Sequence, residues 1–267
     1  MLKFRVHEML VDRAEAVTRR FVNRVNDLLP TGWRFQISPM PRREDGVSSH
    51  PALPSTYVPV RLVEGTGSLR QVGRGSASGP QDWRHRFRLA LSDLIGRSAT
   101  ATFYLVDGRD NIFIDSYMSR QLDVADLERT TAEAAAGALI HALEENIQGG
   151  DSDLYPDYLE RPGPGGSIRT SHRTGQLETA LAAHREAIWT EASVMGGVRM
   201  DDEARSRPPG YSPGDAPPGQ RYEFYEPYLM ADDSIRAVMF RMEGRTILGS
   251  DIVTFRSLAA FQAALPG

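Results

Sequence analysis

The chain has 267 residues, 40% of them hydrophobic and 25% charged, and its formal net charge is −4. This is the composition of an ordinary soluble globular protein with one large core or two smaller ones. The absence of cysteine excludes disulfides, thiol nucleophiles and thiolate-bound zinc. No run approaches about 18 apolar residues and the first residues lack the apolar segment of a signal peptide, so we expect no membrane segment and a cytoplasmic location.

Charge is unevenly distributed along the chain. Residues 1–100 carry 16 basic and 9 acidic side chains, whereas residues 101–267 carry 15 and 26. A basic half can bind nucleic acid or an acidic partner, but it can equally attract an acidic half of the same chain. No block of about five like charges occurs, which favours the second explanation, so we expect no nucleic-acid binding. Lys3 is the only lysine, and such an arginine-rich composition indicates a GC-rich bacterial genome of the actinobacterial kind.

The first part of the chain alternates between helical and strand patterns. A helix is predicted over residues 4–29, because apolar side chains recur every three or four positions and Pro30, Thr31 and Gly32 end it. The next predicted elements are a strand (33–37), a proline-rich loop (38–55), a hairpin (56–63 and 68–72, turning at 64–67), a Gly/Ser connector (73–79) and a helix with Pro80 in its first turn. A second hairpin (101–106 and 111–117) leads into an alanine-rich helix (123–147).

The second part begins with residues 149–175, whose prolines and glycines indicate a linker or a long loop. The elements predicted after it are a helix (176–195), a proline- and glycine-rich loop that we expect not to pack (206–219), an aromatic strand (221–228), a hairpin (234–242 and 245–255) and a short helix (257–265).

Helix 176–195 carries a stripe that includes Leu181, His184 and Ile188. We expect this stripe to pack against the second hairpin. The more apolar face of that hairpin, which should be the buried one, consists of Val238, Phe240 and Met242.

Alternating strands followed by helical spacing occur twice in the sequence. This pattern predicts an α+β fold with antiparallel sheets each covered by helices and a recurring β-hairpin–helix unit. We expect two modules: residues 1–148 (helix, three strands, helix, two strands, helix) and the smaller residues 176–267, joined by the linker 149–175.

The run Asp110-Asn111-Ile112-Phe113-Ile114-Asp115-Ser116-Tyr117, followed by Leu122-Asp123 and a long helix, is similar to the last two strands and last helix of type III secretion chaperone-like domains. The predicted order of elements to about residue 148 also resembles that class, which includes the YbjN-like and actinobacterial chaperone-like domains. The resemblance is one of topology, covers roughly the first half of the chain and transfers no binding residue. It implies a noncatalytic, often dimeric, protein-binding module.

Three side chains of helix 176–195 are candidates for catalysis. His184 and Glu191 lie two helical turns apart and could act together as a base and its partner, the alternative being a hydrogen-bonded core histidine. The run Glu186-Ala187-Ile188-Trp189 resembles the glutamate-led helix of ribosome-inactivating N-glycosidases, in which an arginine takes the place of Trp189. This resemblance makes Glu186 the third candidate.

No pattern in the sequence predicts a metal or a cofactor. Asp151, Asp153 and Asp157, and the run Asp201-Asp202-Glu203, offer oxygen ligands but match no calcium loop, so we interpret both groups as solvated acidic loops. The connector 73–79 lacks the Gly-Lys-Ser/Thr ending of a phosphate-binding loop.

Four arginines are candidate binding residues. Arg70, Arg74, Arg84 and Arg88, together with His85 and Arg97, could form a positive face opposite the apolar stripe of the helix that begins near Pro80. The interpretation that we favour is an ordinary solvated helix face.

Together these patterns favour a noncatalytic protein-binding protein of chaperone, adaptor or immunity type, which docks its partner on its sheet or on its basic N-terminal surface. A homodimer is compatible with the resemblance. The alternative is an enzyme, a hydrolase or an N-glycosidase-like toxin, with a site at the module junction formed by His184, Glu186, Glu191 and the loop 149–175.

Overall fold

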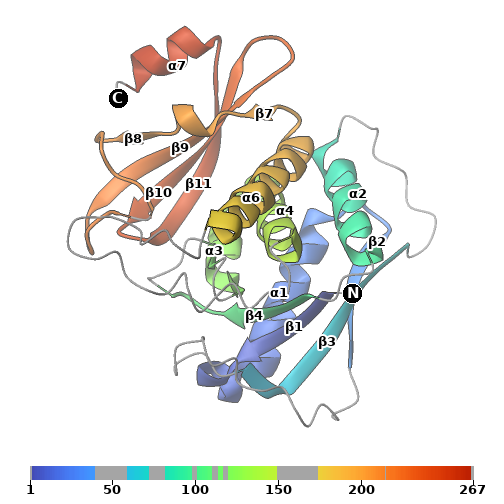
Figure 1. The fold of residues 1–267 in the computed structure, drawn as a ribbon. Helices are drawn as coiled ribbons and strands as arrows, with labels where there is room; N and C mark the ends of the chain where they lie inside the picture. The colour runs from blue at the N-terminus through green and yellow to red at the C-terminus, as the bar shows by residue number, and fades with distance from the viewer. Residues whose placement is uncertain are drawn as a thin grey trace.

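Two β-sheets with most of the helices packed between them make up the described part of the chain (Figure 1). The computed structural model describes residues 2–39, 59–71, 82–97, 101–109, 114–116, 120–148, 174–213 and 215–265. Within these ranges no helix is both long and apolar enough to cross a membrane. The arrangement confirms the α+β fold class, with helices packed on the sheets.

The N-terminal sheet contains strands β1 (Leu2–His7), β2 (Trp33–Pro39), β3 (Pro59–Gln71), β4 (Ala101–Val106), β5 (Asp115–Ser116) and β6 (Gln121–Asp123). Their order across the sheet is β2-β3-β1-β4-β6-β5. Strand β4 runs parallel to both neighbours, β1 and β6, and the other neighbouring pairs are antiparallel. This sheet is therefore mixed, where an antiparallel one was expected.

The first residues form strand β1 instead of the start of the predicted helix 4–29. Leu2, Phe4 and Val6 are buried on one face of β1, at the spacing of two that a strand requires. A 3-10 turn, η1 (Glu8–Arg13), leads into helix α1 (Ala14–Leu28), whose Phe21 ring lies 4.9 Å from that of Phe4. The predicted helix is confirmed only from residue 14 onward.

Strand β3 is continuous through residues 64–67, where the sequence predicted a hairpin turn. A Cβ atom at Gly67 would lie 2.1 Å from Cζ of Phe35 on the adjacent strand β2. The Phe35 ring is buried over this glycine and packs edge-on against Phe4. Gly67 is therefore required by close packing between strands, and not by a turn.

The described residues of the predicted hairpin, 101–106 and 114–116, do not pair with each other. Strand β4 lies between β1 and β6, and β5 pairs with β6 instead. Phe103, Leu105 and Val106 are buried, which is usual for a central strand with parallel neighbours. The hairpin–helix unit is therefore present in the C-terminal half but does not recur at β4.

Helices α2 (Trp83–Gly96), α3 (Val124–Arg129) and α4 (Ala132–Gln148) follow in the N-terminal half. The predicted helix 123–147 is thus split in two around Thr130. Asp123 caps α3 by accepting hydrogen bonds from the backbone N–H groups of Ala125 and Asp126. The Thr130 hydroxyl donates to the carbonyl of Asp126, which completes the last turn of α3.

The C-terminal sheet is antiparallel and contains β7 (Val198–Arg199), β8 (Arg205–Arg207), β9 (Arg221–Leu229), β10 (Ile235–Glu243) and β11 (Thr246–Phe255). Strands β11, β10, β9 and β7 lie in that order, and β8 also pairs with β9. The aromatic strand, the second hairpin and the closing helix α7 (Leu258–Ala264) are confirmed. Val238, Phe240 and Met242 are buried, as predicted.

The proline-rich segment 206–219 packs against this sheet, contrary to expectation. Ser206 and Arg207 belong to β8, Ala216 is buried, and the Tyr211 ring lies 5.6 Å from that of Tyr222. The prolines and glycines prevent a long helix or strand in this segment. They do not prevent an irregular segment from packing its small and aromatic side chains against a sheet.

Helix α6 (Thr174–Met195) packs along α4 between the two sheets (Figure 1). Its buried face includes Ala183, Ala187 and Val194, whereas His184 and Ile188 are partly exposed. The predicted packing of the His184 stripe against the second hairpin is therefore wrong. The apolar core continues from the N-terminal half into the C-terminal sheet.

Candidate functional site

Eight ionisable side chains converge where α4 and α6 meet the C-terminal sheet, and we call them the junction cluster. They lie on α4, α6, β7, β9 and the 3-10 turn η3 (Asp201–Glu203). The members are His141, Glu145, His184, Glu191, Arg199, Asp201, Glu226 and Tyr228.

Glu191 on α6 is the centre of the cluster and is buried. Its carboxylate accepts hydrogen bonds from the Arg199 guanidinium, from Nδ1 of His141 at 2.8 Å and from the Tyr228 hydroxyl. Burial alone would raise the pKa of Glu191, but Arg199 and His141 hold it well below its usual range. Glu191 is therefore ionised and its oxygens are fully engaged.

Two histidines meet at Glu145 on α4. Nε2 of His141 lies 3.5 Å from one carboxylate oxygen, and Nδ1 of His184 lies 3.1 Å from the other. The two rings are edge to face with centroids 5.0 Å apart. Burial alone would lower the pKa of His141, but hydrogen bonds to Glu145 and Glu191 raise it to about 10, and the two histidines lower the pKa of Glu145 to about 2 against its own burial.

Arg199 connects the centre of the cluster to its rim. It donates from Nε to Asp201 at 2.6 Å and from Nη2 to Glu226 at 3.3 Å. Burial raises the pKa of Glu226, and the nearby Arg199 opposes that rise. Three carboxyl groups, those of Glu191, Asp201 and Glu226, therefore share this one arginine.

Gly137 on α4 brings the two helices close enough for these contacts. A Cβ atom at this position would lie 3.0 Å from Sδ of Met195 and 3.4 Å from Cγ of Glu191. The glycine therefore makes room for the Glu191 side chain between α4 and α6.

The structure does not bring the three predicted catalytic residues together as one site. His184 and Glu191 both belong to the junction cluster, but His184 contacts Glu145 and Asp201 while Glu191 contacts His141. Glu186 lies on the exposed face of α6 and is not a member.

Most members of the junction cluster were not predicted from the sequence. His141 and Glu145 share a face of α4 at a spacing of four residues, a signal that the surrounding alanines concealed. Arg199, Glu226 and Tyr228 come from another part of the chain, so only the tertiary fold brings them together with the histidines.

The four candidate binding arginines do not form one face among the described residues. Arg84 lies over the Trp83 ring and Arg88 lies 4.4 Å from the centre of the Trp33 ring. Arg70 is exposed and lies opposite Arg34 in the register of strands β2 and β3. Because Arg34 is next to Trp33 along β2, the side chains of Arg34 and Arg70 lie on the face of the sheet opposite to Trp33. Arg74 lies outside the described residues.

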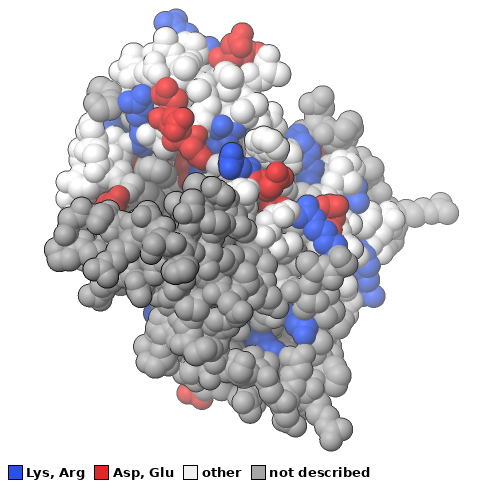
Figure 2. Space-filling view, viewed as in Figure 1, with Lys and Arg blue, Asp and Glu red and all other residues white. Residues whose placement is uncertain are grey.

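Of the predicted acidic and glycine-rich segments, only the run Asp201-Asp202-Glu203 at η3 lies within the described residues. Asp201 binds Arg199, and Glu203 binds Arg205 and Gln262. Asp151, Asp153 and Asp157 and the connector 73–79 lie outside the described residues. On the face shown in Figure 2, basic and acidic side chains of the described residues are intermixed.

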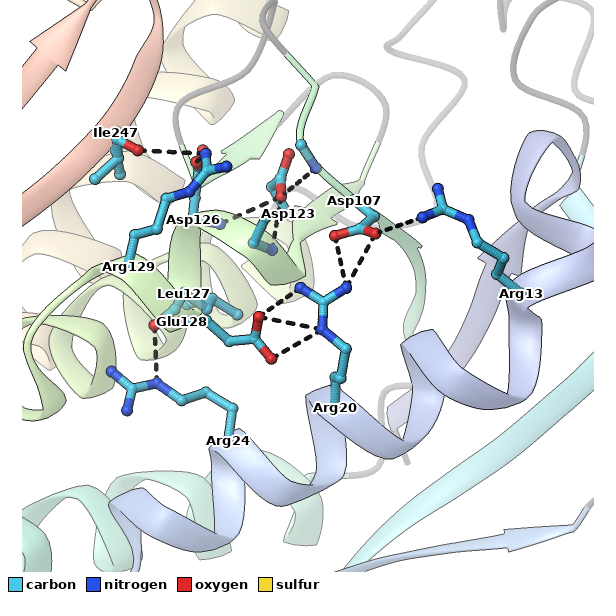
Figure 3. A network of polar contacts seen from close by, with 12 residues as sticks. Arg13, Arg20, Arg24, Asp107, Asp123, Asp126, Leu127, Glu128, Arg129 and Ile247 are labelled. Atoms are coloured by element: carbon cyan, nitrogen blue, oxygen red, sulfur yellow. Dashed lines mark hydrogen bonds and ion pairs between the residues drawn. The ribbon is translucent and has the colours of Figure 1, made fainter.

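A second polar network joins α1 to α3 (Figure 3). Arg20 binds both oxygens of Asp107 at 3.0 Å and Glu128 at 3.0 Å, and Arg13 binds Asp107 at 3.3 Å. The buried carboxylate of Asp123 accepts hydrogen bonds from the backbone at the end of β4 and at the start of α3. These contacts hold elements together, so we interpret the network as structural.

No family model matches this chain, and neither a curated protein nor a solved structure is found to be similar to it.

Proposed function

We propose that this chain is a noncatalytic binding protein, which docks a protein partner through the exposed face of α6 and the adjoining strand β7. The observation that carries the proposal is Trp189, which is 68% exposed on a helix whose opposite face is buried against α4. Tryptophan is among the residues that most often dominate protein–protein binding energy. Val198, on the short edge strand β7 that follows α6, is also largely exposed.

Two further points support a binding role without catalysis. Glu191, the predicted partner of a catalytic base, is buried and its oxygens are engaged by Arg199, His141 and Tyr228. The second point is the resemblance of the sequence to chaperone-like domains, which implies protein binding although the structure does not contain the predicted order of elements. The cytoplasmic location and the absence of nucleic-acid binding belong to the same proposal.

The test is site-specific photocrosslinking in the native host. A photoreactive amino acid at position 189 should capture a partner protein, whereas the same group at Leu248, which is 49% exposed on β11, should not. With the purified partner, Trp189→Ala should weaken binding by about 2 kcal/mol or more, roughly thirtyfold. Equal capture at both positions, or unchanged affinity, would show that α6 is not the docking surface. Capture of a second copy of the chain would identify a homodimer.

An enzyme remains the second candidate because of His184. Its side chain is 42% exposed and its two ring nitrogens lie 3.1 Å from Glu145 and 3.9 Å from Asp201, as a solvent-accessible base with carboxylate partners would. If the chain is a hydrolase, His184→Gln should abolish turnover while leaving the fold intact. If it is an N-glycosidase-like toxin, Glu186→Gln should abolish adenine release from ribosomal RNA.

A further inference from the structure

We propose that His141, Glu145 and His184 form a binding site for a divalent first-row transition metal ion such as zinc, at the contact between α4 and α6. Among the described residues, one nitrogen or oxygen atom from each of these three side chains lies within 4.8 Å of the others. This site is independent of the proposed docking surface on the exposed face of α6.

The distances within the group suit an ion placed between the side chains. His184 Nδ1 lies 3.1 Å from Oε1 of Glu145, and His141 Nε2 lies 3.5 Å from Oε2. Ligand atoms about 2.0–2.2 Å from a zinc ion lie roughly 3.0–3.5 Å from one another in tetrahedral or octahedral geometry. Small side-chain rotations would therefore bring all three groups to a common ion.

The outer contact of His141 follows the pattern found around bound metals. A metal-binding histidine usually donates its second ring N–H to a carboxylate, which fixes the ring and leaves the other nitrogen free to bind. His141 directs Nδ1 to Glu191 at 2.8 Å and Nε2 towards Glu145. His184 directs Nδ1 to Glu145, and its Nε2 lies 3.9 Å from Asp201, which is beyond hydrogen-bond distance.

The outer carboxylate of His141 is itself held in place. Glu191 is bound by Arg199 and by the Tyr228 hydroxyl, so its orientation is fixed before any ion arrives. His141 and Glu145 lie one turn apart on α4, and their separation is set by the helix. Two of the three ligands are thus preorganised, and the third comes from α6.

Access and donor chemistry define the kind of ion. The His141 and Glu145 side chains are only 13% and 12% exposed, but that of His184 is 42% exposed, which leaves one side open for an ion with water ligands. Two imidazole nitrogens and one carboxylate favour zinc, cobalt, nickel or iron(II), whereas calcium and magnesium prefer oxygen ligands. An ion here would join α4, in the N-terminal half, to α6.

The experiment is a titration of the full chain, with any purification tag removed, with Co²⁺ followed by visible absorption and with Zn²⁺ in competition. We expect saturable uptake of one ion per chain that excess Mg²⁺ does not reverse. His184→Ala and Glu145→Gln should each weaken binding at least about tenfold. Matched controls, His85→Ala on α2 and Glu186→Gln on the exposed face of α6, should bind as the wild type does.

Circular dichroism and melting without metal establish that each variant is folded. Because His184 is partly exposed, His184→Ala tests the site even if Glu145→Gln fails to fold. Absence of saturable uptake by the wild type would overturn the proposal, as would equal affinity in His184→Ala. Loss of binding in His85→Ala alone would place the ion elsewhere and also overturn it.

Discussion

The guanidinium of Arg236 and the carboxylate of Glu133 form two parallel hydrogen bonds of 2.6 Å, which join strand β10 to the first turn of helix α4. Both side chains are largely shielded from solvent, at 28% and 9% exposure. A carboxylate in the first helical turn also interacts favourably with the helix dipole. This pair therefore connects the C-terminal sheet to the helix that carries His141 and Glu145, two of the three ligands of the proposed metal site.

Removing this connection should destabilise the protein. Arg236→Met keeps an extended apolar side chain but leaves Glu133 without its bidentate partner, and we expect a loss of about 1.5–3 kcal/mol in the free energy of unfolding. The matched control is Arg241→Met, because Arg241 pairs with Asp251 on the exposed surface of the same hairpin. That variant should lose less than about 1 kcal/mol. Urea denaturation measures both, and equal losses would contradict the special role of Arg236.

Glu191 should be far more sensitive to substitution than Glu186 on the same helix. Glu191→Gln removes the negative charge between Arg199 and His141 at a buried position, and we expect a cost of about 3 kcal/mol or more. Glu186→Gln changes an exposed side chain and should stay within about 0.5 kcal/mol of the wild type. Thermal melts at neutral pH distinguish them, and a small effect at Glu191 would show that the network adapts to its loss.

Asp126 should make stability fall as pH rises from about 4 to 8. Burial and the neighbouring Asp123 raise its pKa to about 8, despite Arg129 and hydrogen bonds from the backbone of Ile114 and Ile247. The folded state then binds a proton that the unfolded chain, with a carboxyl pKa near 4, has released. Its contribution to stability is complete below about pH 4 and is lost as pH passes 8.

The variant Asp126→Asn isolates this effect because its side chain stays neutral. The melting temperature of the variant minus that of the wild type should increase between pH 5 and pH 8.5, whatever the other groups do. A difference that is constant over this range would mean that Asp126 is ionised throughout.

The sequence predicted local elements well where one periodicity dominated. The strand 221–228, the second hairpin and helix 176–195 were found because their apolar spacing fits one structure. Residues 4–7 were wrongly assigned to a helix, because the strand pattern of Leu2, Phe4 and Val6 lies close to the helical spacing that begins at Ala14 and the helical pattern was extended over both. The pairing of β4 between β1 and β6 joins segments far apart in the chain, which local spacing does not encode.

The candidate site was only partly predictable for a similar reason. His184 and Glu191 were visible as polar residues on one helix, but their partners lie on α4 and on strands of the C-terminal sheet. His141 and Glu145 lie on a helix rich in buried alanines. The composition of this helix therefore indicated an apolar core helix and gave no sign of the charged contacts that these two side chains make. Only the packing of α6 on α4 reveals that the two histidines share one carboxylate.

Gly67 should tolerate no side chain, because its neighbour occupies the space a methyl group needs. A Cβ atom there would lie 2.1 Å from Cζ and 2.2 Å from Cε2 of Phe35, whose buried ring also packs against Phe4 and Phe21. Gly67→Ala must therefore displace an aromatic ring of the core, and we expect a loss of about 2–3 kcal/mol in the free energy of unfolding.

Gly96→Ala is the control, since no atom lies within 4 Å of its added methyl group and residue 96 is helical. The free energy of unfolding of this variant should be unchanged or higher by up to about 1 kcal/mol. Combining Gly67→Ala with Phe35→Leu, which frees space over β3, should cost less than the sum of the two single changes. Strict additivity in denaturant unfolding would show that the ring of Phe35 does not determine the glycine at position 67.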